Sequence, residues 1–310
     1  MPGIQQVKTF WKTLKSVSIS EIARESEHPV VMAVVGEPEK RKEVLRKLFP
    51  DATEEDILPE RSLVRNFDST SKELGFPTDT FDFVIDAGGG RADATNGLKI
   101  YSVPEVGGWE RLVQHILDEH PELSLSLARR FPGFREEVSQ RIIKDTAISN
   151  AEFAMLNALP GLVPILGPLL SLGGISDLLM LTKNQAMMLF RLAAAHDLPL
   201  DLRSRARDIA PLLGNAFGWR AIAREVVGVV PGGVGLAARG AIAYAGTIAI
   251  GQALHRFYHT GQLPTRAQIN RFYREALAGA REIVRQKLLK KHKPAAKHPV
   301  LPAPDSREEG

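Results

Sequence analysis

The chain has 310 residues, a net charge of +4 and 44% hydrophobic residues, which suits a protein of two domains with packed cores. It contains no cysteine, which excludes disulfides, thiolate nucleophiles and cysteine-based zinc sites. The sequence pI of about 9.3 and the mean hydropathy of −0.10 describe a basic chain that differs from a polytopic membrane protein.

Residues 1–28 are expected to form an N-terminal amphipathic helix. No apolar core or small-residue cleavage site of a secretory signal is found there. Apolar side chains recur at helical spacing: Val7, Phe10, Trp11 and Leu14. Docking of this helix on the chain's own domain is the preferred interpretation, ahead of contact with a membrane surface.

Residues 29–122 alternate strand-like and helix-like stretches. Strands are expected in VVMAVV, FDFVID and LKIYS, with SLVRNFD as an edge strand, and helices in PEKRKEVLRKLF and GWERLVQHILDEH. Strands that alternate with helices predict a small, mostly parallel α/β sheet.

The first strand leads into a segment with the layout of a phosphate-binding loop. The working pattern is G-x-x-x-x-G-K-[ST], and here Gly36 and Lys42 occupy the positions of the first glycine and the lysine. Arg41 replaces the second glycine and Glu43 replaces the magnesium-binding hydroxyl. Because carboxylates repel a triphosphate, the sequence predicts a vestigial loop that binds no nucleotide cofactor.

A second partial motif follows the third strand. Asp86 and Gly89 form a D-x-x-G pattern, which GTPases use for magnesium and the γ-phosphate, but no N-K-x-D signature for guanine follows. The expected vestigial site therefore comprises Gly36, Lys42, Glu43, Asp86 and Gly89 in a degenerate, shortened P-loop GTPase-like domain.

Residues 123–150 read as a charged helical connector, and residues 151–290 as a helical domain with two apolar stretches. Those stretches are Phe153–Thr182, whose lone charge is Asp177, and Val226–Leu254, whose lone charge is Arg239. Residues 291–310 are expected to be a disordered tail. The predicted class is thus α/β plus all-α.

Both apolar stretches are long enough to cross a bilayer, but helix breakers interrupt them. Basic segments flank them on every side, and the positive-inside rule would keep all of these on the cytoplasmic face. Two re-entrant hairpins satisfy both constraints, and a buried core of a soluble helical domain is the alternative. The expected hairpin residues are Pro160, Pro164, Pro168, Asp177, Pro231 and Arg239.

Two further features of the sequence are candidate sites. His255 and His259 are one helical turn apart, but HRFYHT lacks the glutamate of a metalloprotease, so interfacial residues are preferred to a metal site. The basic C-terminal segment could attract anionic lipid. Nucleic acid is disfavoured as a partner because stacking aromatics are absent from Ala276 onward.

With these motifs in view, the chain resembles the bacterial GTPase-like proteins with a C-terminal domain of unknown function 697, the YcjF-like membrane-associated family. The similar segments are ALPGLVPILGP, NQAMMLFRLAAAHDL, AIAREVVGVVPGGVG and AIAYAGTIAIGQALHRFYHTG, within about residues 145–265. The resemblance implies association with the cytoplasmic face of the inner membrane.

The expected function is a membrane-associated pseudo-GTPase that acts as an interaction or scaffold protein and not as an enzyme. Its expected partners are membrane lipid and a protein partner or a second copy. One alternative is a membrane-associated GTPase with an atypical phosphate loop, in which Lys42 and Asp86 contact the nucleotide. The other is an oligomeric hairpin module that forms a channel or remodels membranes.

Overall fold

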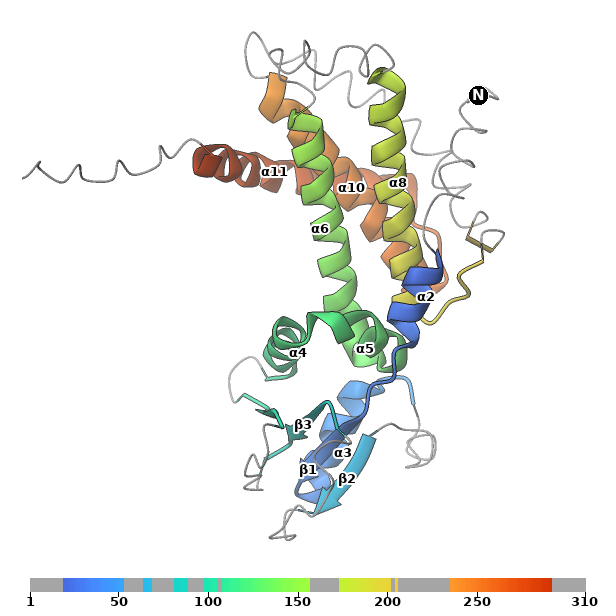
Figure 1. The fold of residues 1–310 in the computed structure, drawn as a ribbon, viewed down its shortest axis with the longest axis vertical. Helices are drawn as coiled ribbons and strands as arrows, with labels where there is room; N and C mark the ends of the chain where they lie inside the picture. The colour runs from blue at the N-terminus through green and yellow to red at the C-terminus, as the bar shows by residue number, and fades with distance from the viewer. Residues whose placement is uncertain are drawn as a thin grey trace, which may run out of the picture.

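The computed structural model describes residues 19–52, 64–68, 81–88, 98–104, 108–156, 173–201, 204–205 and 235–291. A small parallel sheet lies at one end of the molecule and a long helical bundle rises from it (Figure 1). The predicted class, α/β plus all-α, is confirmed at this level.

The sheet contains four strands in the described residues, in the order β2-β1-β3-β4, and all of their pairings are parallel. The sequence placed SLVRNFD at an edge, and β2 is an edge strand, as predicted. The bounds are β1 Met32–Gly36, β2 Val64–Asp68, β3 Phe83–Asp86 and β4 Ile100–Ser102.

Strand β1 is central and buried along its whole length. Its alternate side chains point to opposite faces, because successive residues of a strand alternate. Met32 and Val34 join the main core, while Ala33 and Val35 form a small cluster with Val84 on the other face. This explains why the run is apolar throughout and does not alternate with polar residues.

Eight α-helices lie in the described residues, and two 3-10 turns, η2 (Pro121–Leu123) and η3 (Pro132–Phe134), flank α5. The helices are α2 Ile19–Glu27, α3 Pro38–Leu48, α4 Gly108–Glu119, α5 Ser124–Arg130, α6 Arg135–Leu156, α8 Gly173–Ala195, α10 Gly235–Thr260 and α11 Arg266–Lys291. Of the predicted N-terminal helix, α2 is described, and the apolar positions from Val7 to Leu14 lie outside the described residues.

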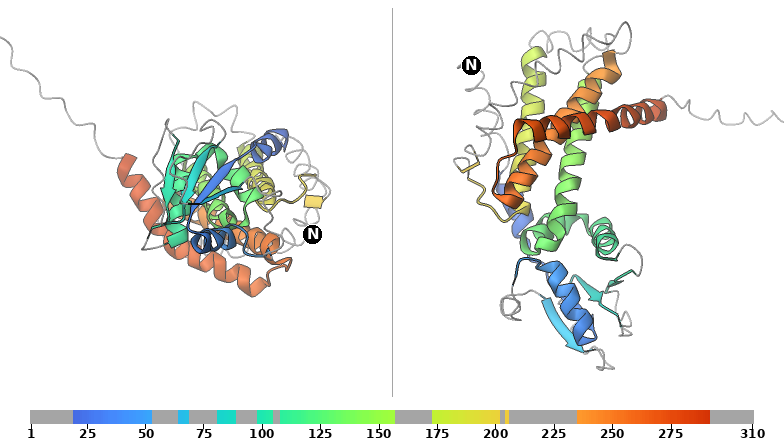
Figure 2. Two further views of the ribbon diagram at one scale, coloured as in Figure 1. Left: turned by 90° about the horizontal axis from the view of Figure 1, so that it is seen from below. Right: turned by 180° about the vertical axis from the view of Figure 1, so that it is seen from behind.

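Helices α6, α8 and α10 form the bundle, and α11 lies across α10 (Figure 2). Both α8 and α10 are antiparallel to α6: Asn150 near the end of α6 bonds to Asn184 and Thr247, whereas Glu136 at its start bonds to His255. The predicted connector of residues 123–150 is therefore largely a bundle helix and its base.

Glycines bring α6 and α10 close together. A Cβ added at Gly251 would lie 2.7 Å from both Cγ1 and Cγ2 of Ile143, and one added at Gly240 would lie 2.7 Å from Cγ of Met155. The small residues that the sequence assigned to a membrane hairpin thus serve helix packing over this part of α10.

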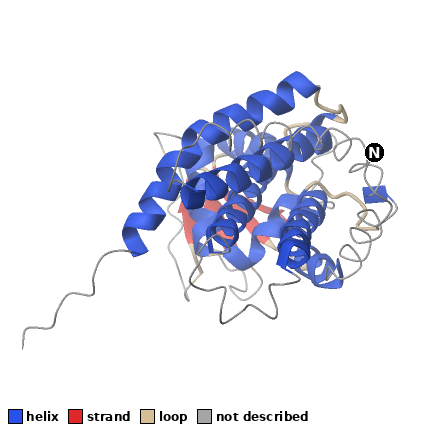
Figure 3. Cartoon of the chain, turned by 90° about the horizontal axis from the view of Figure 1, so that it is seen from above, coloured by secondary structure: helices blue, strands red, loops and turns tan. Residues whose placement is uncertain are grey.

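One continuous core joins the sheet to the bundle. It contains Met32 and Phe83 from the sheet together with Phe190 and Leu254 from the bundle. At the junction a Cβ on Gly133 would overlap the carbonyl oxygen of Lys47, so α3 packs directly on the η3 turn. Figure 3 looks down the bundle, with the strands beneath the helices.

The second predicted hairpin, Val226–Leu254, requires a correction. Its residues 235–254 belong to α10, one continuous helix whose Ala245, Ala249 and Ala253 are fully buried. The physical reason is that glycine and alanine permit close helix packing, which in this segment outweighs their cost to helix propensity. Among the described residues, no helix is both long and apolar enough to cross a membrane.

Candidate functional site

The carboxyl ends of β1 and β3 meet at the point where ligands bind in open parallel sheets. Chain order reverses there, because β2 lies on one side of β1 whereas β3 and β4 lie on the other. Gly36 ends β1 with a φ of 131°, and a Cβ at this position would lie 2.8 Å from the carbonyl oxygen of Gly88. The structure therefore brings Gly36 and Asp86 to one edge, as the sequence predicted.

The connection from β1 to α3 is too short to be a phosphate loop, which corrects the predicted layout. Strand β1 ends at Gly36 and α3 begins at Pro38, so Glu37 alone connects them. Its N–H donates to the carbonyl oxygen of Gly88 at 3.3 Å and is not free for a phosphate. Pro38 has no N–H to offer.

The remaining loop residues lie inside helix α3. Lys42 and Glu43 are exposed, and the Lys42 ammonium pairs with Glu39 at 3.2 Å. Proline at the first helical position fixes the φ that a helix needs, which explains why the helix starts early. The residues expected to be a vestigial loop are therefore an ordinary helical turn.

Asp86 stabilises the turn after β3. Its Oδ1 accepts a hydrogen bond of 2.8 Å from the N–H of Gly88, a φ-positive glycine, which is the usual chemistry of an aspartate turn. Gly89 lies outside the described residues.

Lys40, which the sequence did not single out, approaches this turn. A Cβ built on Gly88 would lie 3.4 Å from the Lys40 Nζ. Lys40 also lies 4.0 Å from the carboxylate of Glu37, so its charge is partly balanced within the protein.

Of the predicted hairpin residues, Asp177 and Arg239 are described, near the bundle end that lies away from the sheet. Pro160, Pro164, Pro168 and Pro231 lie outside the described residues, and Asp177 and Arg239 lie on α8 and α10. The last turn of α6 and the first turns of α8 and α10 lie at this end, as their antiparallel pairing requires (Figure 1). The rest of the two apolar stretches, residues 157–172 and 226–234, lies outside the described residues.

A buried polar network lies at the opposite end of the bundle. His196, directly after α8, and His255 of α10 are 6% and 8% exposed, and Ser139 of α6 is fully buried. His196 Nε2 lies 3.3 Å from His255 Nδ1 and 3.4 Å from Ser139 Oγ. The other ring nitrogen of His255 bonds to Glu136 at 2.8 Å.

The pKa shifts of Glu136 and His196 indicate how these two groups are protonated in the network. A hydrogen bond from His255 lowers the pKa of Glu136 to about 2, so this carboxylate accepts and His255 Nε2 carries a proton. Burial, followed by the charges of His255, Arg135 and His259, lowers the pKa of His196 to about 3. His196 is therefore neutral at pH 7.

The network holds three helices together, and it offers no substrate access to Ser139 because that hydroxyl is fully buried. The expectation that His255 is interfacial was wrong, since its ring lies inside the bundle. The described residues contain no group of three His, Asp or Glu side chains that could hold a metal ion. Spacing along the sequence could not reveal the network, because His196 and His255 are 59 positions apart.

A second set of hydrogen bonds joins the three helices nearer the end of the bundle that lies away from the sheet. Asn150, which is 1% exposed, donates to Thr247 at 2.9 Å and accepts from Asn184 at 2.8 Å. Between the two networks, Gln140 and Gln252 exchange side-chain hydrogen bonds. Polar contacts thus align α6, α8 and α10 along their length.

Comparisons with models of protein families, with curated proteins and with solved structures find no match to this chain. The family suggested by the sequence motifs therefore remains an expectation.

Proposed function

We propose that this chain is a non-enzymatic scaffold that docks on a membrane through the far end of its helical bundle. Its α/β part, at the other end, would be held away from the lipid as a surface for protein partners. In this proposal it binds no nucleotide, so it acts as a pseudo-GTPase.

The position of three helix termini supports the assignment of the docking end. Leu156 ends α6, Gly173 begins α8 and Gly235 begins α10, and all three lie at the same end. These termini adjoin residues 157–172 and 206–234, which contain much of both apolar stretches. The two stretches are far apart in sequence, yet their helix junctions gather on one end of the bundle.

The connection of β1 to α3 supports the pseudo-GTPase part. A phosphate loop requires several backbone N–H groups that wrap the phosphates. Here Glu37 alone links strand and helix, and its N–H is used within the protein. The exposed carboxylates of Glu37 and Glu39 add repulsion toward a phosphate.

Vesicle flotation of the full chain tests the docking end. The vesicles consist of a zwitterionic phospholipid, alone or mixed with an anionic phospholipid. The double variant Ile165→Asp/Val229→Asp puts one charge in each apolar stretch, and each buried charge costs about 2.5–3.5 kcal/mol in a bilayer. The wild type should float, and the variant should stay with the soluble fraction.

Leu263→Asp is the matched control, because Leu263 is 46% exposed and follows α10 at the end near the sheet. It should float like the wild type. A wild type that stays in the soluble fraction with both vesicles contradicts membrane docking. Equal flotation of all three proteins contradicts the assignment of the docking end.

A further inference from the structure

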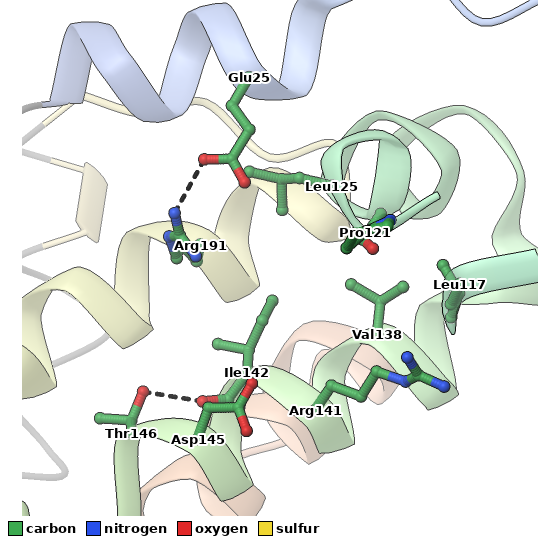
Figure 4. A pocket seen from close by; sticks show the side chains of 11 residues that line it. Glu25, Leu117, Pro121, Leu125, Val138, Arg141, Ile142, Asp145, Thr146 and Arg191 are labelled. Carbon is green, nitrogen blue, oxygen red and sulfur yellow. Dashed lines mark hydrogen bonds and ion pairs between the residues drawn. The ribbon is translucent and has the colours of Figure 1, made fainter. Parts of the chain in front are cut away.

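A cavity of about 240 Å³ opens where the N-terminal helix meets the bundle (Figure 4). Side chains of α2, α4, η2, α5, α6 and α8 converge on it, and clefts between helices are common ligand sites. It is separate from the sheet edge and from the buried histidines. Its lining is Glu25, Leu117, Pro121, Ser124, Leu125, Val138, Arg141, Ile142, Asp145, Thr146 and Arg191.

The base of the cavity is apolar. Leu117, Leu125 and Val138 line it and are at most 2% exposed, and Ile142 adds a partly buried aliphatic surface. A small aliphatic group could pack on these side chains. Because sites for drug-sized ligands have about 300–1,000 Å³, this cavity suits a ligand no larger than an amino acid.

Arg191 contributes an unused hydrogen-bond donor. Its Nη2 donates to Oε2 of Glu25 at 2.9 Å, which fixes the guanidinium at the cavity. The Arg191 side chain is 41% exposed, so its guanidinium is accessible from the cavity. Because a guanidinium has five N–H donors, a ligand oxygen can pair with those that Glu25 leaves unused.

Asp145 contributes an unused acceptor on the facing helix. It is exposed at the cavity and, within the described part of the chain, forms no hydrogen bond or ion pair. Arg141, one turn earlier, cannot neutralise it, because its guanidinium binds Asp118 at 2.7 Å, Glu137 at 3.1 Å and the carbonyl oxygen of Gln114 at 3.2 Å. Thr146 is also engaged, since its hydroxyl donates to the carbonyl oxygen of Ile142.

Arg191 and Asp145 lie at the same level of two antiparallel helices. Asn150 faces Asn184, and Ser139 faces His196, so position 191 of α8 lies opposite the turn that contains position 145 of α6. Figure 4 shows both side chains among those that line the cavity. One small molecule can therefore reach both groups.

The charges of the lining side chains determine which group of a ligand binds at Asp145 and which binds at Arg191. The lining has two acidic and two basic side chains, but Arg191 pairs with Glu25, and Arg141 pairs with Asp118 and Glu137. Asp145 is therefore the lining carboxylate without a basic partner among the described residues, and it favours a cation. We infer that this cavity binds a small aliphatic ammonium compound with an oxygen acceptor beside the amine, the chemistry of an α-amino acid or its carboxamide. The ammonium lies at Asp145, the oxygen accepts from Arg191, and the aliphatic group packs on Leu125, Val138 and Ile142.

Four related probes separate the required groups: leucine, leucinamide, isoamylamine and 4-methylpentanoate. Leucinamide and leucine have both polar groups, isoamylamine lacks the oxygen, and 4-methylpentanoate lacks the ammonium. Titration of the full chain, followed by protein NMR, should give saturable binding of the first two. Isoamylamine should bind at least tenfold more weakly than leucinamide, and 4-methylpentanoate should show no saturation.

Asp145→Asn is the diagnostic variant, because it keeps the size of the side chain and removes only the charge. It should weaken leucinamide at least tenfold, whereas Lys144→Gln, a change to the exposed neighbouring residue, should leave binding unchanged. Arg191→Lys, which keeps the charge but loses the planar set of guanidinium N–H donors, should reduce the preference for leucinamide over isoamylamine.

The inference fails if none of the probes saturates, if 4-methylpentanoate binds as well as leucine, or if Asp145→Asn binds like the wild type. It stands apart from the proposed membrane scaffold, because these titrations contain no lipid and use none of the apolar stretches.

Discussion

His196 Nε2 lies 3.3 Å from His255 Nδ1, so a histidine directly after α8 and a histidine of α10 share one hydrogen bond inside the bundle. Ser139 of α6 lies beside the same nitrogen, and Glu136 of α6 fixes the far side of the His255 ring. The groups that face this pair are therefore two hydrogen-bonding side chains of α6, the charged Arg135, and His259 of α10. A buried neutral histidine in this setting links folding to pH.

We expect the free energy of unfolding to decrease as the pH falls below 6.5. Burial and nearby positive charges lower the pKa of His196 to about 3 in the folded protein, from 6.5 in the unfolded chain. Between these values the unfolded chain binds a proton that the folded protein does not. The slope is about 1.4 kcal/mol per pH unit from this residue, and above pH 6.5 its contribution is constant. Urea unfolding at a series of pH values measures it.

The variant His196→Gln should flatten this pH dependence between pH 6 and 4, although it also costs stability by disturbing the network. His28→Gln, on an exposed histidine, is the control and should keep the wild-type slope. Equal slopes in the wild type and His196→Gln would show that His196 does not carry the effect. Glu136 adds a second loss at lower pH, as the pH falls from 4.5 toward 2. Its side chain is 71% exposed, so its share is about 1 kcal/mol or less.

Two glycines of α10 should respond in opposite ways to alanine. Gly251→Ala places a Cβ 2.7 Å from two carbons of the β-branched Ile143, so it should destabilise the protein by about 1–3 kcal/mol. Gly246→Ala meets nothing within 4 Å and should stabilise it by about 0.5–1 kcal/mol, because alanine favours a helix. Urea midpoints of both variants give the comparison. Similar shifts of the same sign would contradict the close contact of α6 and α10.

A substitution of Gly133 disturbs the contact between α3 and the η3 turn and so tests whether the sheet and the bundle fold as one unit. A Cβ there would overlap the backbone carbonyl oxygen of Lys47, which cannot rotate away as a side chain can. The same glycine accepts a hydrogen bond of 3.3 Å from the Trp109 indole. Gly133→Ala should therefore lower the free energy of unfolding by about 2 kcal/mol or more. In a Trp11→Phe/Trp219→Phe background, which leaves Trp109 as the one tryptophan, it should also change Trp109 fluorescence. Gly279→Ala, which has open space around its position, should leave Trp109 fluorescence unchanged.

Restoring the missing motif residues should not restore nucleotide binding. Arg41→Gly/Glu43→Ser recreates the pattern G-x-x-x-x-G-K-S, but both positions lie within helix α3 and not in a loop. A glycine in a helix costs about 1 kcal/mol, so a small loss of stability is expected. Calorimetric titration with GTP and Mg²⁺ should give no saturable heat for the wild type or the variant. Saturable binding by the wild type would favour the alternative of a membrane-associated GTPase.

The sequence by itself determined the parallel sheet, its edge strand and several of the helices. The β-branched run VVMAVV predicts a buried strand from its composition, and Gly36 follows it with the positive φ that glycine adopts at low cost. The amphipathic patterns of α3 and α4 likewise follow from local spacing, with Val44, Leu45 and Leu48 buried in one and Leu112, Val113 and Ile116 in the other.

The tertiary structure decided what the apolar and polar residues are for. The glycine- and alanine-rich residues 235–254 suit a membrane hairpin or a packed helix equally well by composition, and only contact with Ile143 and Met155 selects the packed helix for that segment. The loss of the loop after β1 depends on where α3 begins, which local spacing did not reveal. The pairing of His196 with His255, and of the cavity residues Arg191 and Asp145, depends on antiparallel helices, because residues distant in sequence meet only when those helices pack.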